Sequence, residues 1–261
     1  MTQIKKIIRL NQNQIERFSR QILINEIGNN GQIKFMNIPV IIIGCGGLGT
    51  TVATYLSMLG VRNLGLVDND KVSLSNLNRQ TLFNEKDIND SKVKVIRKKL
   101  KLINSDMNLK IYNKKITIEN IDNIIKNYEI VLDCTDNFKS RYLINDACFK
   151  NKKILISAAL HSFEIQLFCF KAWENKSNPC YRCIFPESDL TENIGNCDSF
   201  GIISSVAGLG GLFQSLCVVK AILKKDKRMY NEFLMYDCLN LNQKKISYQK
   251  NPHCSICKVD K

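Results

Sequence analysis

A glycine-rich turn between an apolar run and a helical pattern is the first feature that could do chemistry. Its four glycines follow a β-branched run directly: Gly44, Gly46, Gly47 and Gly49. Asp68 ends the next apolar run, about 20 residues further on. Such glycines let a phosphate approach the backbone at a helix start, and the acid can accept a ribose hydroxyl. The pattern predicts a nucleotide site without choosing between NAD and ATP; close strand-helix packing is the alternative reason for the glycines.

Two cysteine pairs form the second chemical pattern, Cys180-x-x-Cys183 and Cys254-x-x-Cys257. This spacing lets one turn present both sulfurs to a tetrahedral Zn²⁺. One pair alone could be a redox motif, whereas two pairs favour structural zinc. Four sulfur ligands leave no open position for catalysis, so we expect the ion to pin the C-terminal tail to the loop that follows the sheet.

The elements that position these groups can be predicted from hydrophobic periodicity. Short β-branched runs predict strands buried on both faces at 38–43, 64–67, 130–132 and 154–156. Helical patterns are found at 47–59, 92–103 and 137–149. A further amphipathic pattern, 13–27, predicts an N-terminal helical arm that ends at Gly28. The alternation of strand and helix indicates a parallel sheet with helices on both faces.

The pattern changes after about Ser162. Apolar and polar residues alternate over 163–170, as in antiparallel strands with one solvated face. A long apolar helix is expected at 201–223, with strands at 233–236 and 245–248. We therefore predict an α/β, Rossmann-like, doubly wound fold. Its mostly parallel sheet becomes mixed at the C-terminal side, with an N-terminal helical arm and a zinc-pinned C-terminal lobe.

Composition bounds the setting of the protein. A chain of 261 residues, 44% of them hydrophobic, suits one large α/β domain or at most two small ones. It offers neither a secretory signal nor a long uncharged apolar run, so we expect a cytoplasmic protein, no membrane partner, and metal ligands or free thiols among its 11 cysteines. The net charge of +14 suggests an anionic partner, unless it only reflects a bias toward lysine. Without aromatic-basic interleaving, nucleic acid is not expected.

Ordered motifs along nearly the whole chain resemble the ThiF/MoeB/HesA family, bacterial relatives of the ubiquitin-activating enzymes. They are the glycine loop, Lys92, and the stretches 17–21 (RFSRQ), 68–80 (DNDKVSLSNLNRQ), 133–137 (DCTDN), 179–183 (PCYRC) and 254–257 (CSIC). Asn89 and Ser205 depart from the family pattern, where a glycine and a proline are common. Neither change removes a charged group, and asparagine tolerates left-handed backbone.

The resemblance implies a nucleotide site residue by residue. Gly47 would lie by the ATP phosphates and Asp68 would take the ribose. The residues that line the nucleotide would be Ser75, Asn76, Leu77, Asn78 and Arg79. Arg79 and Lys92 would then neutralise phosphate charge.

Three further residues match family positions with separate roles. Asp136, with Asn137 beside it, matches the acid associated with Mg²⁺. Arg20 matches an arginine that reaches into the neighbouring subunit's ATP site, which implies a homodimer. Cys197 matches a cysteine that bonds covalently to the carrier or its sulfur in some ThiF-type enzymes; an ordinary exposed thiol is the alternative.

The implied reaction joins ATP to the C-terminal glycine carboxylate of a small ubiquitin-like sulfur carrier, MoaD-like or ThiS-like, which ends in Gly-Gly. The acyl-adenylate then receives a persulfide, giving a thiocarboxylate for molybdenum-cofactor or thiamine biosynthesis. No rhodanese-like extension follows Cys257, so we expect a separate sulfur donor protein. One domain over 1–261 would comprise the arm (1–37), a nucleotide-binding half (38–160) and a carrier-binding half with the zinc site (161–261).

Two other functions fit parts of the sequence. The glycine loop and Asp68 alone would suit an NAD-dependent oxidoreductase, and the cysteine pairs would suit a non-catalytic, zinc-stabilised module that binds the carrier. Hydride transfer gives no reason for Arg79, Lys92 and Asp136 together. A binding module would not need the complete set of ATP-site groups.

Overall fold

The protein is built around one eight-stranded sheet in the order β3-β2-β1-β4-β5-β6-β7-β8. The computed structural model describes residues 6–187 and 201–258. Five strands are parallel: β1 (Pro39–Ile43), β2 (Asn63–Val67), β3 (Asn108–Tyr112), β4 (Ile130–Asp133) and β5 (Ile154–His161). Three strands continue the sheet antiparallel: β6 (Glu164–Phe170), β7 (Glu232–Asp237) and β8 (Asn242–Ser247). The predicted change from parallel to mixed pairing is confirmed, and it falls between β5 and β6.

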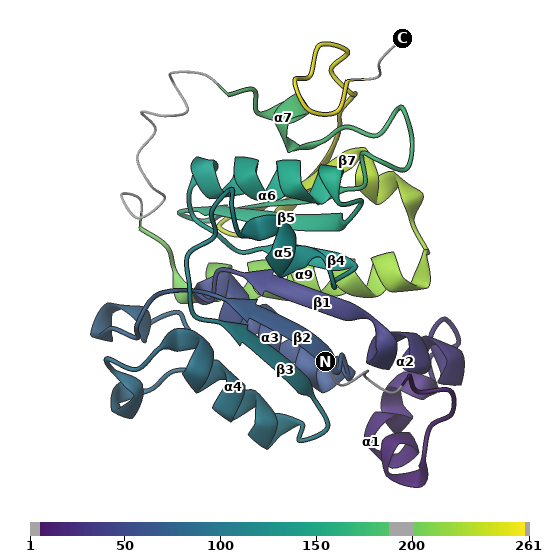
Figure 1. Ribbon diagram of the computed structural model, residues 1–261, viewed down its shortest axis with the longest axis vertical. Helices are drawn as coiled ribbons and strands as arrows, with labels where there is room; N and C mark the ends of the chain where they lie inside the picture. The colour runs from purple at the N-terminus through teal and green to yellow at the C-terminus, as the bar shows by residue number, and fades with distance from the viewer. Residues whose placement is uncertain (1–5, 188–200, 259–261) are drawn as a thin grey trace.

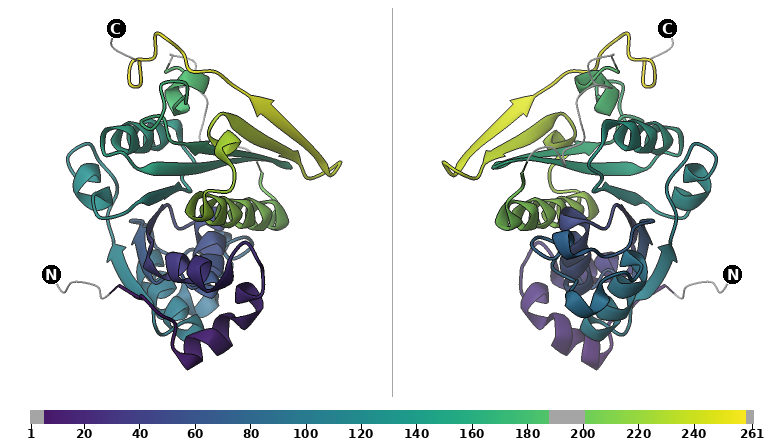
Figure 2. Two further views of the ribbon diagram at one scale, coloured as in Figure 1. Left: turned by 90° about the vertical axis from the view of Figure 1, so that its right-hand side faces the viewer. Right: turned by 90° about the vertical axis from the view of Figure 1, so that its left-hand side faces the viewer.

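Helices cover both faces of the sheet, as Figures 1 and 2 show. One face carries α3 (Gly47–Leu59), α4 (Lys92–Ile103) and α9 (Ser204–Leu223), and the other carries α5 (Ile121–Ile125), α6 (Phe138–Lys150) and α7 (Tyr181–Ile184). Successive residues of β1 point to opposite faces, so Val40 and Ile42 join one core while Ile41 and Ile43 join the other. A strand buried on both faces needs a continuous apolar run, which confirms the doubly wound arrangement predicted from the sequence.

Helix α9 is apolar on all sides, and its neighbours cover much of its surface. By length and composition alone it could cross a membrane. It packs against α3, β5 and β6, however, and 56% of its apolar 18-residue stretch is buried. The fully buried Gln214 ties it to the sheet, because its Nε2 donates to the Asp133 carbonyl at 2.9 Å and its Oε1 accepts from the Cys134 thiol at 3.2 Å. Helix α9 is therefore a core helix in this fold.

The N-terminal arm is helical, as predicted, but the helix expected over 13–27 ends at Ile22, and the arm contains two helices. They are α1 (Gln12–Ile22), which starts at an Asn11 capping box, and α2 (Gly28–Asn37). Phe18 and Met36 bury a small core between them. The sequence of α2 is rich in glycine and asparagine, both weak helix formers, which is why its pattern gave no helical prediction.

Short elements complete the described chain. They are the 3₁₀ turns η1 (Leu74–Asn76), η2 (Glu85–Asp87) and η4 (Lys227–Tyr230). The helices predicted at 47–59 and 92–103 have the predicted bounds, whereas β3, α5 and α7 were not predicted. Asn89 adopts a positive φ of 74°, the left-handed conformation for which asparagine can replace glycine.

Candidate functional site

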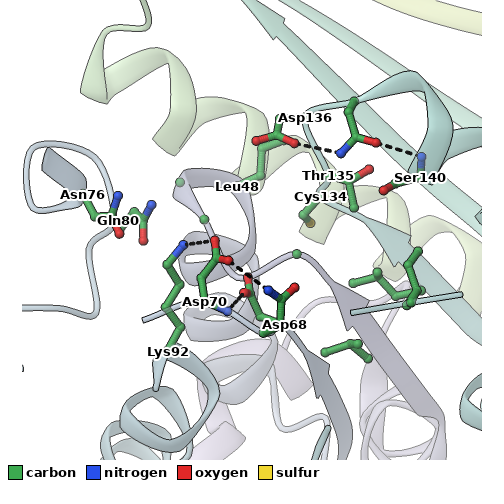
Figure 3. A pocket seen from close by; sticks show the side chains of 18 of the residues that line it. Leu48, Asp68, Asp70, Asn76, Gln80, Lys92, Cys134, Thr135, Asp136 and Ser140 are labelled. Carbon is green, nitrogen blue, oxygen red and sulfur yellow. Dashed lines mark hydrogen bonds and ion pairs between the residues drawn. The ribbon is translucent and has the colours of Figure 1, made fainter. Parts of the chain in front are cut away.

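A cavity of about 410 Å³ opens at the carboxyl ends of β1, β2 and β4. The strand order reverses between β1 and β4, so the cavity lies at the switch point where open α/β sheets bind their ligands. Its lining includes five cationic side chains, Arg79, Lys92, Lys114, Lys115 and Arg141, and three acids, Asp68, Asp70 and Asp136. Figure 3 shows the labelled acids and Lys92 converging on the same space. This excess of positive charge favours an anionic ligand.

The glycine turn shapes the floor of the cavity. Gly44 has a φ of +92°, and a Cβ there would lie 2.6 Å from the Cys134 carbonyl oxygen. A Cβ on Gly49 would lie 2.0 Å from the Gly44 carbonyl oxygen, so this glycine allows α3 to approach the turn. Helix α3 begins at Gly47 without a side-chain cap, which leaves its first amides free to bind an anion.

Replacing Gly44 with alanine is expected to destabilise the fold by about 1–3 kcal/mol, because the residue would be strained and its Cβ would collide with backbone. Gly208 is the control: nothing lies within 4 Å of its Cβ position in α9, and alanine there should be neutral or stabilising. Urea unfolding of both variants measures the difference. Equal midpoints for Gly44→Ala and the wild type would contradict the role given to the turn.

Asp68 is held rigidly at the end of β2. Its Oδ2 accepts a hydrogen bond from the Cys45 amide at 2.7 Å, and its Oδ1 accepts from the Asp70 amide at 2.8 Å. A carboxylate can accept about four hydrogen bonds, so two backbone donors fix its orientation and leave room for a ligand's hydroxyl groups. This geometry is the one expected of a ribose-binding acid.

Two cations approach the cavity from the segment after β2 and from α4. The Lys92 Nζ lies 2.9 Å from the Asp70 Oδ2, and its side chain is only 7% exposed. Arg79 Nη1 donates to the Ser75 carbonyl and to the Asn78 Oδ1, each at 3.0 Å. Beside them Gln80 is buried, and its Oε1 accepts no hydrogen bond from any residue that the structure describes. The cavity wall thus combines cations with an acceptor that a ligand can use.

The carboxyl end of β4 supplies an exposed acid on a fixed turn. Buried Asp133 accepts hydrogen bonds from the Thr135 amide and hydroxyl and from Ser157, and so locks the turn. Asp136 follows, and its Oδ1 accepts from the Asn137 side chain at 3.1 Å. Asn137 in turn caps α6. Asp136 is left facing the cavity with acceptor capacity for a cation.

The two cysteines of the cavity region are core residues. Burial raises the pKa of the Cys45 and Cys134 thiols well above the ordinary value. Both thiols are therefore neutral near pH 7 and poor nucleophiles.

The structure brings most of the predicted nucleotide-site residues to this cavity. They are Gly44, Gly46, Gly47, Asp68, Asn76, Arg79, Lys92, Asp136 and Asn137. Gly49, Ser75, Leu77 and Asn78 do not line it; Ser75 and Asn78 instead accept hydrogen bonds from Arg79.

Two predicted catalytic residues are not at the cavity. Arg20 is exposed on α1. The arm leads into the amino end of β1, and the cavity lies at the carboxyl end of that strand. The reach of Arg20 into a neighbouring subunit stays a prediction. Cys197 lies outside the described residues.

The cavity lining also includes polar residues that were not predicted, among them Asp70, Gln80, Lys114, Lys115 and Arg141. The first two lie within or directly after the nucleotide stretch, and their polarity beside Asp68 and Arg79 was a usable signal. The lysines follow β3, a strand that the sequence did not reveal. Arg141 lies in a helix, where one cation carries no signal of its own.

A second site lies at the far end of the molecule, where the predicted metal ligands converge. The four Sγ atoms of Cys180, Cys183, Cys254 and Cys257 lie within 4.8 Å of one another. The distances are 4.0 Å for Cys180 to Cys183, 3.6 Å for Cys180 to Cys254 and 3.3 Å for Cys183 to Cys257. A tetrahedral Zn²⁺ with Zn–S bonds of about 2.3 Å places its sulfurs about 3.8 Å apart. The cluster therefore fits a zinc site.

Hydrogen bonds among these sulfurs favour a thiolate. Those that Cys183 accepts from Cys180 and Cys257 lower the pKa of the Cys183 thiol. A thiolate is the form that binds a metal.

Fold and cavity together define a nucleotide-binding α/β protein with a four-cysteine cluster. The model of the ThiF family matches residues 18–256, and the chain belongs to that family.

Two relatives illustrate the match. The adenylyltransferase and sulfurtransferase MOCS3 of Culex quinquefasciatus is 39% identical over 231 residues, which cover 88% of this chain and 52% of the relative. The sulfur carrier protein adenylyltransferase of Thermus thermophilus is 31% identical over 252 residues, which cover 96% of this chain and 93% of the relative. The chain thus spans about half the length of several curated relatives that it matches.

Solved structures of Escherichia coli MccB share the fold. MccB with ATP superposes with a TM-score of 0.79 at 23% identity, covering 92% of this chain and 74% of that chain. MccB with MccA-N7isoASN gives a TM-score of 0.81 at 22% identity, covering 95% of this chain and 75% of that chain. At this level of identity the likeness concerns the fold.

Proposed function

We propose that the protein is an ATP-dependent adenylyltransferase. It activates the C-terminal glycine carboxylate of a ubiquitin-like sulfur carrier as an acyl-adenylate. The observation that carries the proposal is the cavity at the switch point, where an uncapped helix start and several cations share the lining with the exposed acid Asp136. The relatives are an adenylyltransferase and sulfurtransferase and a sulfur carrier protein adenylyltransferase, which supports the same activity.

The reaction explains why the cavity is rich in cations and needs no general base. A terminal carboxylate is already ionised at neutral pH and can attack the α-phosphorus of ATP directly. The obstacle is mutual repulsion, since two anions must be brought in line. Arg79 and Lys92 offset that repulsion and stabilise the charge that builds on the leaving pyrophosphate. The carboxylate oxygen becomes bonded to the α-phosphorus as the bond to pyrophosphate breaks.

Two metal ions belong to the proposal. Asp136 offers one carboxylate at the cavity, which suits Mg²⁺ because this ion commonly takes one or two carboxylates and completes its shell with phosphates and water. Bound there, Mg²⁺ would neutralise phosphate charge. The four-cysteine cluster would hold Zn²⁺ as a structural ion, with Cys180 and Cys183 on one loop and Cys254 and Cys257 on the tail.

The active unit would be a cytoplasmic homodimer, with Arg20 completing the ATP site of its neighbour. A separate protein would supply the persulfide, and the thiocarboxylate would serve molybdenum-cofactor or thiamine biosynthesis. Arg20 supports the dimer because it is exposed and does not line the cavity of its own chain.

We expect the purified protein to exchange labelled pyrophosphate into ATP only when Mg²⁺ and a carrier ending in Gly-Gly are both present. Exchange requires reversible adenylate formation, so it reports the chemical step itself. A carrier lacking its last glycine is the matched control and should give no exchange. Stabilisation by NAD in preference to Mg-ATP in thermal unfolding, with no exchange for any carrier, would favour an oxidoreductase instead.

A further inference from the structure

The geometry points to Asp70 as a positioning residue: we infer that it holds the ammonium of Lys92 in the phosphate-binding part of the cavity. The inference rests on the proposed adenylyltransferase activity and adds a residue to its machinery. Asp70 makes an ion pair of 2.9 Å with Lys92, and Figure 3 shows the two side chains meeting inside the cavity.

A short antiparallel ladder places the two residues side by side. The Lys92 amide donates to the Asp70 carbonyl at 3.0 Å, and the Val72 amide donates to the Asp90 carbonyl at 2.9 Å. A bridge between Lys71 and Ser91 lies between these bonds. The start of α4 is therefore tied to the segment after β2 by backbone and side chain together.

The same residue connects this ladder to the ribose-binding acid. The Asp70 amide donates to the Asp68 Oδ1 at 2.8 Å, so Asp68 and Lys92 are anchored to one residue. A shift of Asp70 would move the two groups that the proposed function assigns to the ribose and to the phosphates of one nucleotide. Their relative placement is what an in-line attack depends on.

Burial explains why Lys92 needs this partner. Its side chain is 7% exposed, whereas that of Asp70 is 57% exposed. A buried ammonium without a counter-charge either loses its proton or turns toward solvent. The more exposed carboxylate of Asp70 is solvated and does not need a counter-charge. Lys92 therefore depends on Asp70, and Asp70 does not depend on Lys92.

The sign of the effect separates positioning from simple electrostatics. If Asp70 only added negative charge to an anion-binding cavity, its removal would tighten ATP binding and leave kcat unchanged or higher. If it positions Lys92, its removal lowers kcat. We expect Asp70→Asn to reduce the kcat of pyrophosphate exchange by about a hundredfold with a smaller change in KM for ATP.

Asp90→Asn is the matched control. It removes the same charge from the same ladder, but Asp90 is exposed, and the structure shows only its backbone in the ladder. This variant should keep the wild-type kcat and KM. An Asp70→Asn variant whose kcat lies within twofold of that of Asp90→Asn would overturn the inference.

A double variant tests whether Asp70 acts through Lys92. In a Lys92→Gln background, Asp70→Asn should cost almost nothing further, because the group that it positions is gone. Losses that multiply would overturn the inference. If Asp70→Asn alone failed to fold while the double variant folded, the buried ammonium would be shown to require Asp70.

Amine labelling reads the same contact without activity. Mass spectrometry should show that Lys92 reacts several-fold faster with acetic anhydride in Asp70→Asn than in the wild type, while Lys94 reacts equally in both. Unchanged Lys92 labelling would contradict the inference. If Asp70→Asn changes Lys92 labelling but the wild-type protein shows no pyrophosphate exchange, the proposed function is wrong, whereas the contact between Asp70 and Lys92 is supported.

Discussion

Arg79→Ala is expected to lower the kcat of carrier-dependent pyrophosphate exchange by about a thousandfold while the protein stays folded. Arg79 lines the cavity and comes from the turn that also supplies Asn76 and Gln80. Its Nη1 donates to the Ser75 carbonyl and to the Asn78 Oδ1, so groups of the chain itself fix the position of the cation. Pre-placed charge matters most where charge develops during reaction, so kcat should fall more than ATP affinity.

Arg97→Ala provides the control for this loss. Arg97 is exposed on α4 and does not line the cavity, so the variant removes one positive charge from the same side of the sheet without touching the site. Exchange kinetics and the Kd for ATP should be measured for both variants. The assigned role of Arg79 fails if the two variants differ in kcat by less than tenfold.

The parallel half of the fold could be predicted because its strands are buried on both faces. Such strands are apolar over most of their length, and the short β-branched runs in β1 (Pro39–Ile43) and β4 (Ile130–Asp133) favour strands over helices. The edge strand β3 was not predicted because one of its faces is solvated and Lys110 at its centre interrupts the apolar run. Edge strands carry less signal because less of their surface is buried.

The site divides in the same way. Asp68 follows β2 directly, and the glycine-turn pattern was enough to predict it; Asp136 is the third residue after β4 and was predicted from the family resemblance. The pairing of Asp70 with Lys92 depends on backbone hydrogen bonds between two irregular segments. Such segments have no hydrophobic periodicity from which their pairing could be predicted. Lys114 and Lys115 follow the strand that was missed, so their approach to the cavity could not be inferred. Sequence patterns thus located the strand ends, and tertiary structure supplied the neighbours.

Replacing Cys254 with serine is expected to lower the melting temperature by about 10 °C and to release the zinc ion that we propose for the cluster. The cluster joins the loop at 180–183 to the tail at 254–257, and few other contacts tie that tail down. Loss of a structural metal is one of the few mechanisms that can cost about 4 kcal/mol, and 1 kcal/mol corresponds to about 2–4 °C in a domain of this size. Thermal unfolding and a chromogenic zinc assay measure the two effects. Cys238→Ser is the control, because Cys238 lies outside the cluster and should change neither.

The loss of structure in Cys254→Ser should be confined to the C-terminal tail, and testing this confinement is more decisive than measuring the melting temperature. Tyr181, between the two cysteines of the loop, is 1% exposed and packs against Phe168 and Phe185 in the core under α6. Its amide also donates to Asn145 at 2.9 Å, so the loop stays anchored when the tail is lost. None of the residues that line the nucleotide cavity comes from the tail. We therefore expect Cys254→Ser to be cut by protease after β8 yet to bind ATP with the wild-type Kd; a large loss of ATP affinity would mean that the cluster supports the sheet itself.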